Sequence, residues 1–265
     1  MTTDNEKIHW KQPERVIVWD TETTGLSPKN GDKIVEIGAL ELVDGKPTGK
    51  EFHQYINPKR HIPSRATKVH GISDEDVKDK PPFEDIAEDF LAFVGDSPLV
   101  AHNASFDMRF INAELEAAGH EPIGNERKID TLRLARKLLP GREAYTLDSL
   151  AEHFGIDTSA REDHHGGMVD TRILAEVYQE LVGLAKEQDM DVLSLTAEKA
   201  ATLTEGTGVH AAQLASEREE AEFARAVRDE MILRPAWAEK EAGKGNGFSG
   251  RVVAQEETGY SGGIA

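Results

Sequence analysis

Blocks of apolar and polar residues along the first two-thirds of the chain predict a series of strands and helices. Four short runs rich in apolar and β-branched residues predict strands, at 15–20, 33–43, 51–56 and 98–101. The second run ends at Asp44 and Gly45, a pair that is typical of tight hairpin turns. Because the connections are short, we expect the first three runs to form an antiparallel meander.

Five segments carry apolar residues at the spacing of an amphipathic helix. They lie at 83–94, 108–118, 131–139, 146–154 and 169–184. Gly119 and Gly155 follow the second and fourth segments, and glycine commonly ends a helix. Helices that follow and separate strands predict an α/β fold, with a mixed sheet flanked by helices.

The character of the chain changes after residue 185. We expect a disordered N-terminal arm at 1–13, a main domain at 14–185, a linker at 186–215, a helical segment at 216–240 and a Gly-rich flexible tail at 241–265. Ser216 and Glu219 form a capping box ahead of an apolar stripe at Phe223, Val227 and Met231, which predicts the helix. The stripe either packs back on the main domain or docks on a partner.

The chain is acidic and has no cysteine. Its 31 Lys and Arg against 49 Asp and Glu give a net charge of −18, so it cannot hold nucleic acid by phosphate neutralisation alone. Without cysteine, disulfides, thiolate zinc sites and cysteine nucleophiles are excluded. The sequence shows neither a membrane-length apolar run nor a signal peptide core, so we expect a soluble cytoplasmic protein with no membrane partner.

Acidic residues follow two of the predicted strands. Asp20 and Glu22 end the first strand, whose two-residue period puts both carboxylates on one face, with Cα atoms roughly 6.5 Å apart. Asp107 follows the strand at 98–101 and stands at the start of a helix. Each has an alternative that needs no ligand. The first two residues can form a polar strand end before a turn, and Asp107 can be a helix N-cap.

His165 and Asp170 lie around the start of the last predicted helix. In a regular helix their five-residue spacing leaves the side chains about 140° apart, too far around the helix to share a site. Gly166 and Gly167 remove this difficulty, because glycine tolerates the backbone angles that place the histidine on a loop over the helix start. The alternative is a pair of surface histidines in a turn, and we retain that interpretation for His164.

Taken together, the three sites bring four carboxylates to the ends of elements, where loops of an α/β sheet gather functional groups. Such a group would repel itself strongly unless divalent cations lay among the carboxylates. Two hard cations about 3.5–4 Å apart are the arrangement that clamps attacking and leaving oxygens in phosphoryl transfer, and Mg²⁺ suits it. A metal would then supply the positive charge that the composition lacks.

Seven motifs span residues 15–182 in order: VIVWDTETTGL, KIVEIGALEL, HGIS, LVAHNASFD, IDTLRLAR, YTLDSLAEHFGI and DHHGGMVDTRILAEVY. They closely resemble the DEDDh (DnaQ-like) 3′–5′ exonucleases, in particular the epsilon proofreading subunit of bacterial DNA polymerase III. The resemblance covers about two-thirds of the chain and includes all five family-defining positions. It implies a ribonuclease-H-like fold with a five-stranded mixed sheet and two divalent cations, Mg²⁺ or Mn²⁺.

The resemblance also implies a role for each of the five positions. Asp20, Glu22 and Asp170 would bind the first metal, and Asp20 would bridge to the second. Asp107 would support the second metal directly or through water. His165 would be the general base that activates the attacking water, because its neutral imidazole near pH 7 suits proton abstraction.

By the same resemblance, nine residues would contact the 3′-terminal nucleotide: Thr23, Thr24, Gly25, Leu26, Val69, His70, Asn103, Phe106 and His165. Several have structural alternatives, since Thr24 and Gly25 can shape a turn, His70 can cap a loop and Phe106 can belong to the core. Asp130 also matches the family, but it precedes a helix and is expected to cap it. Glu36 lies in a strand, and no spacing pairs it with the other acidic residues.

We therefore expect a proofreading 3′–5′ DNA exonuclease that releases nucleoside 5′-monophosphates and works as a polymerase subunit. Its partners would be a frayed or single-stranded DNA 3′ end and, through 216–240, the polymerase catalytic subunit. The segment from Gln188 to Leu195 falls where such proteins often carry a sliding-clamp peptide, and the protein would be nucleoid-associated through a bacterial replisome. Two alternatives are a free-standing single-strand DNA or RNA 3′ exonuclease and a non-catalytic structural subunit.

Overall fold

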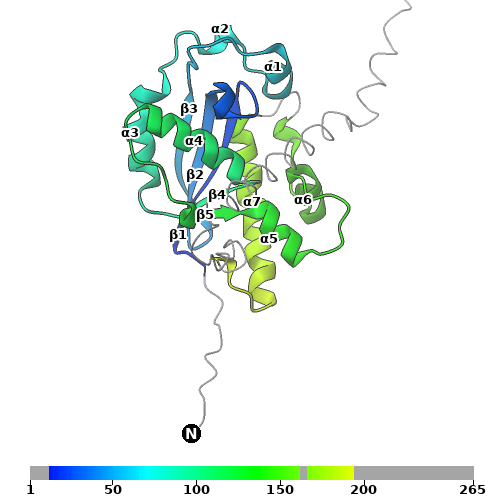
Figure 1. Cartoon of the computed structure of the whole chain (residues 1–265). Helices are drawn as coiled ribbons and strands as arrows, with labels where there is room; N and C mark the ends of the chain where they lie inside the picture. Colours follow the sequence, from blue (N-terminus) through cyan, green and yellow to red (C-terminus); the bar gives the residue numbers. More distant parts are fainter. Residues whose placement is uncertain (1–11, 162–165, 194–265) are drawn as a thin grey trace, which may run out of the picture. The chain divides into compact units, whose positions relative to one another are not determined.

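A five-stranded mixed sheet forms the centre of the fold (Figure 1). The computed structural model describes residues 12–161 and 166–193. The strands are β1 (Arg15–Thr23), β2 (Ile34–Val43), β3 (Lys46–Tyr55), β4 (Leu99–Ala101) and β5 (Lys128–Asp130), in the order β3-β2-β1-β4-β5. The first three strands are antiparallel, and β4 and β5 continue the sheet in parallel with β1. The predicted meander and mixed sheet are both confirmed.

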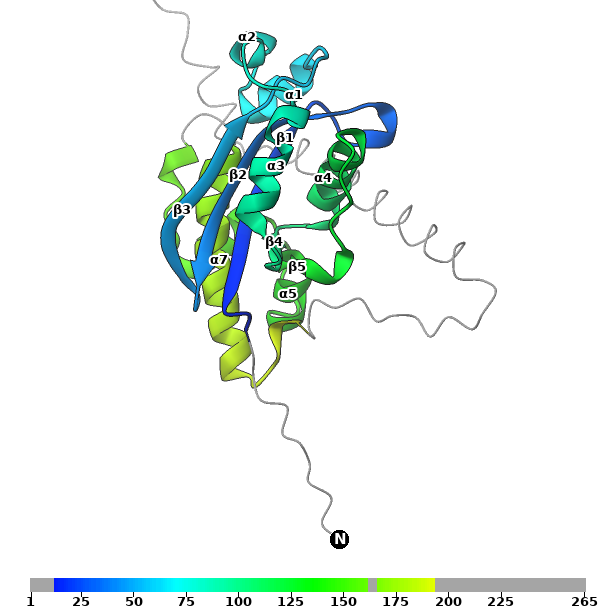
Figure 2. The ribbon, with the colours of Figure 1, turned by 90° about the vertical axis from the view of Figure 1, so that its left-hand side faces the viewer.

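Helices cover both faces of this sheet, as Figures 1 and 2 show together. They are α1 (Ser64–His70), α2 (Asp74–Val77), α3 (Phe83–Val94), α4 (Ser105–Ala117), α5 (Thr131–Leu138), α6 (Leu147–Phe154) and α7 (Gly167–Glu187). One core cluster joins the sheet to α5, α6 and α7, and a second joins the opposite face to α3 and α4. Within the described ranges, no helix has the length and apolarity needed to cross a bilayer.

The alternation of side chains along β1 divides them between the two cores. Val16 and Val18 belong to the cluster with α7, whereas Ile17 and Trp19 belong to the cluster with α3 and α4. All four are buried, because β1 is a central strand with helices on both sides. The same alternation therefore decides toward which face each later side chain of β1 points.

Turn and helix-end signals in the sequence are confirmed. Asp44 and Gly45 both adopt positive φ, at 49° and 73°, as the tight turn between β2 and β3 requires. Gly155 ends α6 in the left-handed conformation at φ 70°, and Gly119 follows α4 at φ 83°. The structure adds the strand β5 and the short helices α1 and α2, for which the sequence pattern gave no prediction.

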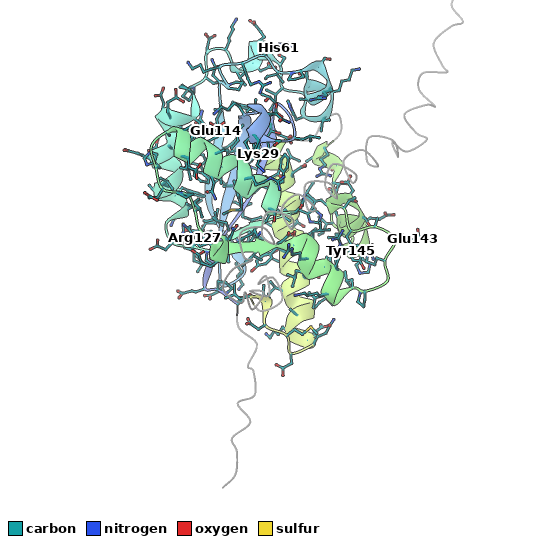
Figure 3. The ribbon with its side chains drawn as sticks, viewed as in Figure 1. Lys29, His61, Glu114, Arg127, Glu143 and Tyr145 are labelled. Carbon is teal, nitrogen blue, oxygen red and sulfur yellow. The ribbon has the colours of Figure 1, made fainter. Side chains whose placement is uncertain are left out.

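Polar side chains tie the loops to the sheet, and three of them are labelled in Figure 3. The Arg127 guanidinium donates to the Ser97 carbonyl at 2.8 and 3.0 Å, before β4. The Glu114 carboxylate on α4 accepts the Ile34 N–H at 3.2 Å and so holds the start of β2. The Tyr145 hydroxyl donates to the Leu139 carbonyl at 2.7 Å and closes the connection from α5 to α6.

The last described helix runs further than predicted. α7 ends at Glu187, and Val192 beyond it is fully buried in the core cluster that α7 helps to form. The Gln188 side chain also reaches the Leu138 carbonyl at 3.5 Å. The first residues of the segment expected as a linker from 186 therefore pack on the domain. Residues 1–11 of the predicted N-terminal arm at 1–13 lie outside the described residues. So do residues 194–265, which comprise the rest of the predicted linker, the helical segment and the tail.

Candidate active site

One face of β1 changes from apolar to acidic along its length. Val16 and Val18 point toward α7, and the two-residue period places Asp20 and Glu22 on the same face at the end of the strand. Across the strand pair, Gly38 of β2 lies opposite Asp20, and Glu36 lies opposite Glu22. The predicted pairing of the two carboxylates on one face is thus realised beside the start of α7.

The start of α7 approaches β2 very closely at Gly38. A Cβ atom on residue 38 would lie 2.5 Å from the carbonyl carbon and oxygen of Gly167, so only glycine fits there. The Thr171 hydroxyl lies 3.0 Å from the Gly38 carbonyl and 2.6 Å from the Gly167 carbonyl, which fastens the first turn of the helix to the strand. Asp170 lies within that turn and is carried toward β1.

Asp20, Glu22 and Asp170 together form the acidic centre of the site. Each offers a carboxylate oxygen, and these three oxygens lie within 4.8 Å of one another. Burial, followed by the charges of Asp107, Glu22 and Asp170, raises the pKa of Asp20 well above its usual value. Burial and then Asp170 raise the pKa of Glu22 in the same way. A cation bound among these groups would relieve the repulsion, so the donor set fits a hard divalent metal.

Arg161 supplies positive charge at the edge of this centre. It ends the 3-10 turn Ser159–Arg161, and its Nε donates to the Asp170 carboxylate while an Nη donates to Asp148. Its charge lowers the pKa of Asp20 and Glu22 and so offsets part of the effect of burial. Sequence reasoning missed Arg161, because no motif spacing links it to the acidic residues.

Asp107 reaches the site from the opposite face of the sheet. Its Oδ1 accepts the Thr21 N–H at 3.2 Å and the Thr21 hydroxyl at 2.7 Å, and the side chain is buried. The alternative that Asp107 is a helix N-cap is wrong, since α4 begins at Ser105 with Ala104 at the cap position. Among the described residues, Asp107 does not join the three-carboxylate group, so its support of a second metal stays a prediction.

The turn after β1 holds three of the expected substrate contacts in fixed positions. The Thr23 hydroxyl donates to the Gly25 carbonyl at 2.6 Å, and Thr24 is fully buried with its hydroxyl accepting the Lys33 N–H at 3.0 Å. A Cβ on Gly25 would overlap the Asp32 carboxylate at 2.3 Å. These contacts support the turn-shaping interpretation for Thr24 and Gly25, and no contact tests their binding of substrate.

Two of the expected contacts are exposed apolar side chains. Leu26 is 42% exposed and Val69 is 39% exposed, and they are two of the four large apolar side chains that are exposed within the described residues. His70, next to Val69 at the end of α1, is buried, and its Nδ1 accepts the Ile72 N–H at 3.1 Å. The capping interpretation of His70 is consistent with that bond.

The loop between β4 and α4 carries the other two expected contacts. Asn103 adopts positive φ, at 62°, and its N–H donates to Asp130 Oδ1 at 3.1 Å. Phe106 is half-buried, and its ring centroid lies 4.9 Å from that of Phe110. Asp130 also accepts the Leu132 N–H at 3.0 Å as the N-cap of α5, which confirms its predicted capping role. His164 and His165 lie outside the described residues.

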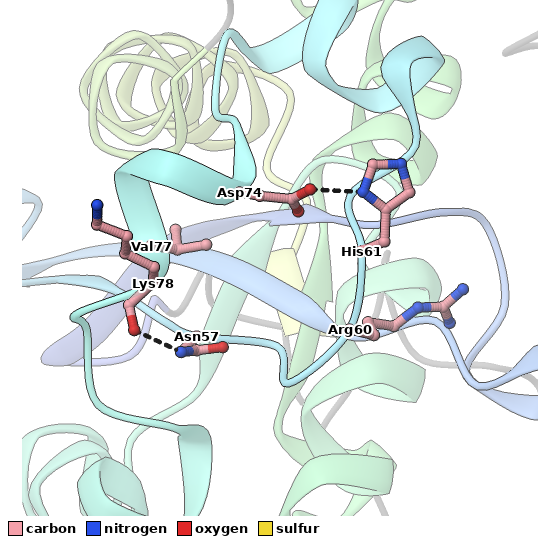
Figure 4. A pocket seen from close by; sticks show the side chains of 6 residues that line it. All are labelled: Asn57, Arg60, His61, Asp74, Val77 and Lys78. Atoms are coloured by element: carbon pink, nitrogen blue, oxygen red, sulfur yellow. Dashed lines mark hydrogen bonds and ion pairs between the residues drawn. The ribbon is translucent and has the colours of Figure 1, made fainter.

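A separate surface pocket of about 360 Å³ contains none of these residues (Figure 4). It is lined by Asn57, Arg60, His61, Asp74, Val77 and Lys78. The Asp74 carboxylate is already bonded to the His61 ring at 2.5 Å and to the Ile62 N–H at 2.7 Å. The Asn57 amide likewise donates to the Lys78 carbonyl at 2.9 Å. Because these polar groups are already bonded, we assign the chemistry to the acidic centre and not to this pocket.

Sequence comparison finds relatives over the same part of the chain. The RNase_T exonuclease family profile matches residues 17–178. The DNA polymerase III subunit epsilon of Rickettsia conorii is 50% identical over 172 residues, which cover 64% of this chain and 74% of that protein. The subunit of the same name from Salmonella typhimurium is 43% identical over 176 residues, covering 64% and 72% of the two chains.

Structural comparison gives the same fold. Exonuclease X, solved in complex with 5′ overhanging duplex DNA, is 30% identical and superposes with a TM-score of 0.54, covering 69% of this chain and 99% of its own. A 3′-exonuclease solved with a histone mRNA stem-loop is 16% identical, with a TM-score of 0.56 over 65% and 83% of the chains. The second likeness shows the fold alone.

Asp107 predicts a pH dependence of stability in the metal-free protein. Burial raises the pKa of Asp107 from 3.8 to about 7. Between these two pH values the folded protein keeps a proton that the unfolded chain has lost, so the free energy of unfolding falls as the pH rises from about 4 to about 7. Asp107→Asn keeps an acceptor for Thr21 and removes this titration. In EDTA, wild type and variant should be similarly stable at pH 4, and the variant should be more stable above pH 7, by on the order of a few kcal/mol.

Urea unfolding at the two pH values measures this difference. A stability difference that is the same at pH 4 and pH 8 would show that the Asp107 carboxyl does not retain its proton in the folded protein.

Proposed function

This chain belongs to the RNase_T exonuclease family and is a 3′–5′ exonuclease, and we propose that it proofreads DNA as a subunit of a replicative polymerase. The observation that carries the proposal is the convergence of Asp20, Glu22 and Asp170, whose carboxylate oxygens lie within 4.8 Å of one another. The products would be nucleoside 5′-monophosphates from a mismatched or frayed 3′ end. The polymerase role is supported by the names of relatives that match the same domain.

The acidic centre is the proposed place of two divalent cations, Mg²⁺ or Mn²⁺. Asp20, Glu22 and Asp170 would hold the first, Asp20 would bridge to the second, and Asp107 would support the second directly or through water. When bound, the cations supply positive charge to the phosphate oxygens on which negative charge develops. The support for this is chemical, because closely spaced carboxylates with raised pKa values are stabilised by a hard cation.

His165 is the proposed general base, taking a proton from the attacking water. It directly precedes Gly166, the N-cap residue of α7, and so stands in sequence at the start of the helix that carries Asp170. A neutral imidazole near pH 7 can accept that proton, whereas carboxylates engaged with cations are poor bases.

The 3′-terminal nucleotide is proposed to lie against the turn after β1 and the end of α1. Leu26 and Val69 support this, because exposed apolar side chains offer a surface for the face of a base. Thr23 and Thr24 would present backbone atoms, since their hydroxyls are already bonded within the turn, and Gly25 would do so because it has no side chain. On the same proposal, His70 would contact the sugar or base, and Asn103 and Phe106 would cover the far side.

The charge of the chain supports a tethered enzyme. With a net charge of −18, the protein has little sequence-independent attraction to DNA, so its own hold on a primer end should be weak. Binding to the polymerase catalytic subunit through 216–240 would raise its effective concentration at that end. The place of action would be the replisome at the nucleoid in the bacterial cytoplasm.

A sliding-clamp contact is proposed for the segment from Gln188 to Leu195. Its support is that Met190 and Leu193 are 36% and 40% exposed, whereas Val192 between them is buried in the core. The two exposed apolar side chains would be the docking groups.

The function is tested by digestion of labelled oligonucleotides with matched, mismatched and RNA 3′ ends, in Mg²⁺ or Mn²⁺. We expect 5′-monophosphates, with mismatched DNA ends removed fastest, and no cleavage in EDTA.

Asp20→Ala should fold and lose all measurable cleavage, because it removes the carboxylate proposed to bridge both ions. Cleavage that persists in Asp20→Ala would contradict the metal assignment. Equal cleavage of RNA would favour the free-standing exonuclease, and an inactive wild type would favour the structural subunit.

His165→Ala should reduce turnover by about 10²–10⁴-fold, the range for loss of a general base. Metal affinity, measured by titration calorimetry with Mn²⁺, should change little. His164→Ala is the matched control and should have nearly wild-type activity. If His165→Ala keeps the pH–rate profile of the wild type, another group is the base.

The tether is tested with a chain that ends at residue 193, which retains Val192 and the rest of the described core. It should digest single strands as the full chain does, since all the proposed catalytic residues lie before 171. It should fail to co-purify with the polymerase catalytic subunit that the full chain binds. In the full chain, Phe223→Asp should give the same loss if the Phe223, Val227 and Met231 stripe is the docking face. Undiminished binding by the shortened chain would place the tether within 1–193.

A further inference from the structure

Glu36 is a buried carboxylate that the proposed chemistry does not use. It lies on β2 between the fully buried Val35 and Ile37, and it is itself only 2% exposed. Its Oε2 accepts the Gly167 N–H at 3.0 Å, and its Oε1 lies 2.7 Å from His53 Nε2 on β3. Burial of a carboxylate is costly unless it is hydrogen-bonded, so these two contacts account for its presence in the strand.

The Gly167 contact replaces a missing helix cap. Gly167 is the first residue of α7, and Gly166 at the N-cap position has no side chain to bind the free N–H groups of the first turn. Glu36 supplies the acceptor from 131 residues earlier in the chain. A carboxylate at this end of a helix is also favoured by the helix dipole.

This cap lies close to the acidic centre in the chain and in the sheet. Asp170 follows Gly167 by one turn, and its N–H donates to the Gly166 carbonyl at 2.9 Å. On the other side, Glu36 is the direct cross-strand neighbour of Glu22. Glu36 therefore connects α7, which provides Asp170, to the strand that pairs with β1, which provides Asp20 and Glu22.

We infer that Glu36 is a positioning residue for the cation site. By holding the first turn of α7 on β2, it sets the place of Asp170 relative to Asp20 and Glu22, and His53 fixes the orientation of its carboxylate. It is not a ligand, because both of its oxygens are engaged elsewhere. The inference rests on the proposed function, since it takes the three carboxylates as a cation site.

The test is titration of the full-length protein with Mn²⁺ by calorimetry, for wild type and three variants. Glu36→Ala should weaken Mn²⁺ binding by about 10–100-fold, the range for loss of a group that orients a metal ligand. Glu36→Gln should stay within a few-fold of wild type. Its amide oxygen can accept the Gly167 N–H, and its NH₂ is placed to donate to His53 Nε2.

Glu41→Ala is the matched control on the same strand. Glu41 is also buried, at 3% exposed, and its partners are Arg15, Thr48 and Lys50. It faces away from α7, because Leu40 and Leu42 on either side belong to the core cluster of that helix. Glu41→Ala should lower the melting temperature and leave Mn²⁺ affinity unchanged, which separates general destabilisation from loss of positioning.

The outcomes distinguish this inference from the function on which it rests. If wild type does not bind Mn²⁺, the cation site itself is wrong. If wild type binds and Glu36→Ala binds equally well, the positioning role is overturned. If Glu36→Gln binds as weakly as Glu36→Ala, the charge of Glu36 is what matters, and positioning is again overturned.

A second variant avoids the risk that Glu36→Ala fails to fold. His53 has a 39% exposed side chain, so its removal threatens the core less than removal of Glu36 does. His53→Ala removes the contact that orients the Glu36 carboxylate toward the Gly167 N–H. It should also weaken Mn²⁺ binding, by a smaller factor than Glu36→Ala does. Wild-type Mn²⁺ affinity in His53→Ala would overturn its part in the inference.

Discussion

The first turn of α7 lies so close to β2 that residue 38 has no room for a side chain. The contact is backbone to backbone, since a Cβ there would lie 2.5 Å from the Gly167 carbonyl. Thr171 and Glu36 then fasten the turn by hydrogen bonds to either side of that approach. The acidic centre depends on this packing, because Asp20 and Glu22 come from the sheet and Asp170 comes only from the helix.

The same packing creates an electrostatic problem that the fold alone resolves only in part. Burial and mutual repulsion raise the pKa values of Asp20 and Glu22, so the ionised centre is destabilising in the metal-free protein. Arg161 offsets some of this through its contact with Asp170. The guanidinium lies at the edge and cannot neutralise all three carboxylates. A compact divalent ion bound between them can. The site is thus built to gain stability from the ligand that the proposed chemistry requires.

Sequence patterns predicted the elements and site residues whose determinants lie close together in the chain. The helix Phe83–Val94 has the predicted bounds, and Asp20 with Glu22 could be paired from the two-residue period of a strand. β5 has only three residues, too few to show a period, and it exists because β4 offers an edge. Thr21 lies 86 residues from its partner Asp107, and Gly167 lies 131 residues from its partner Glu36, so no local spacing could reveal these two contacts. The one local signal for Glu36 was a charged residue in an apolar strand, which required a partner without identifying it.

An acidic protein that acts on an anionic polymer can attract that polymer only where local groups offset the repulsion between them, which here is the reaction centre. With a net charge of −18 the chain has little general attraction to phosphate, so on the proposed function affinity would come mainly from bound cations and from apolar contacts such as Leu26 and Val69. Both kinds of contact act only on a strand end that has entered the site. The paired bases of a nearby duplex reach neither the cations nor the apolar side chains. On the proposed function, weak general attraction therefore favours a frayed end over a paired one, and binding to the polymerase would set how often such an end is met.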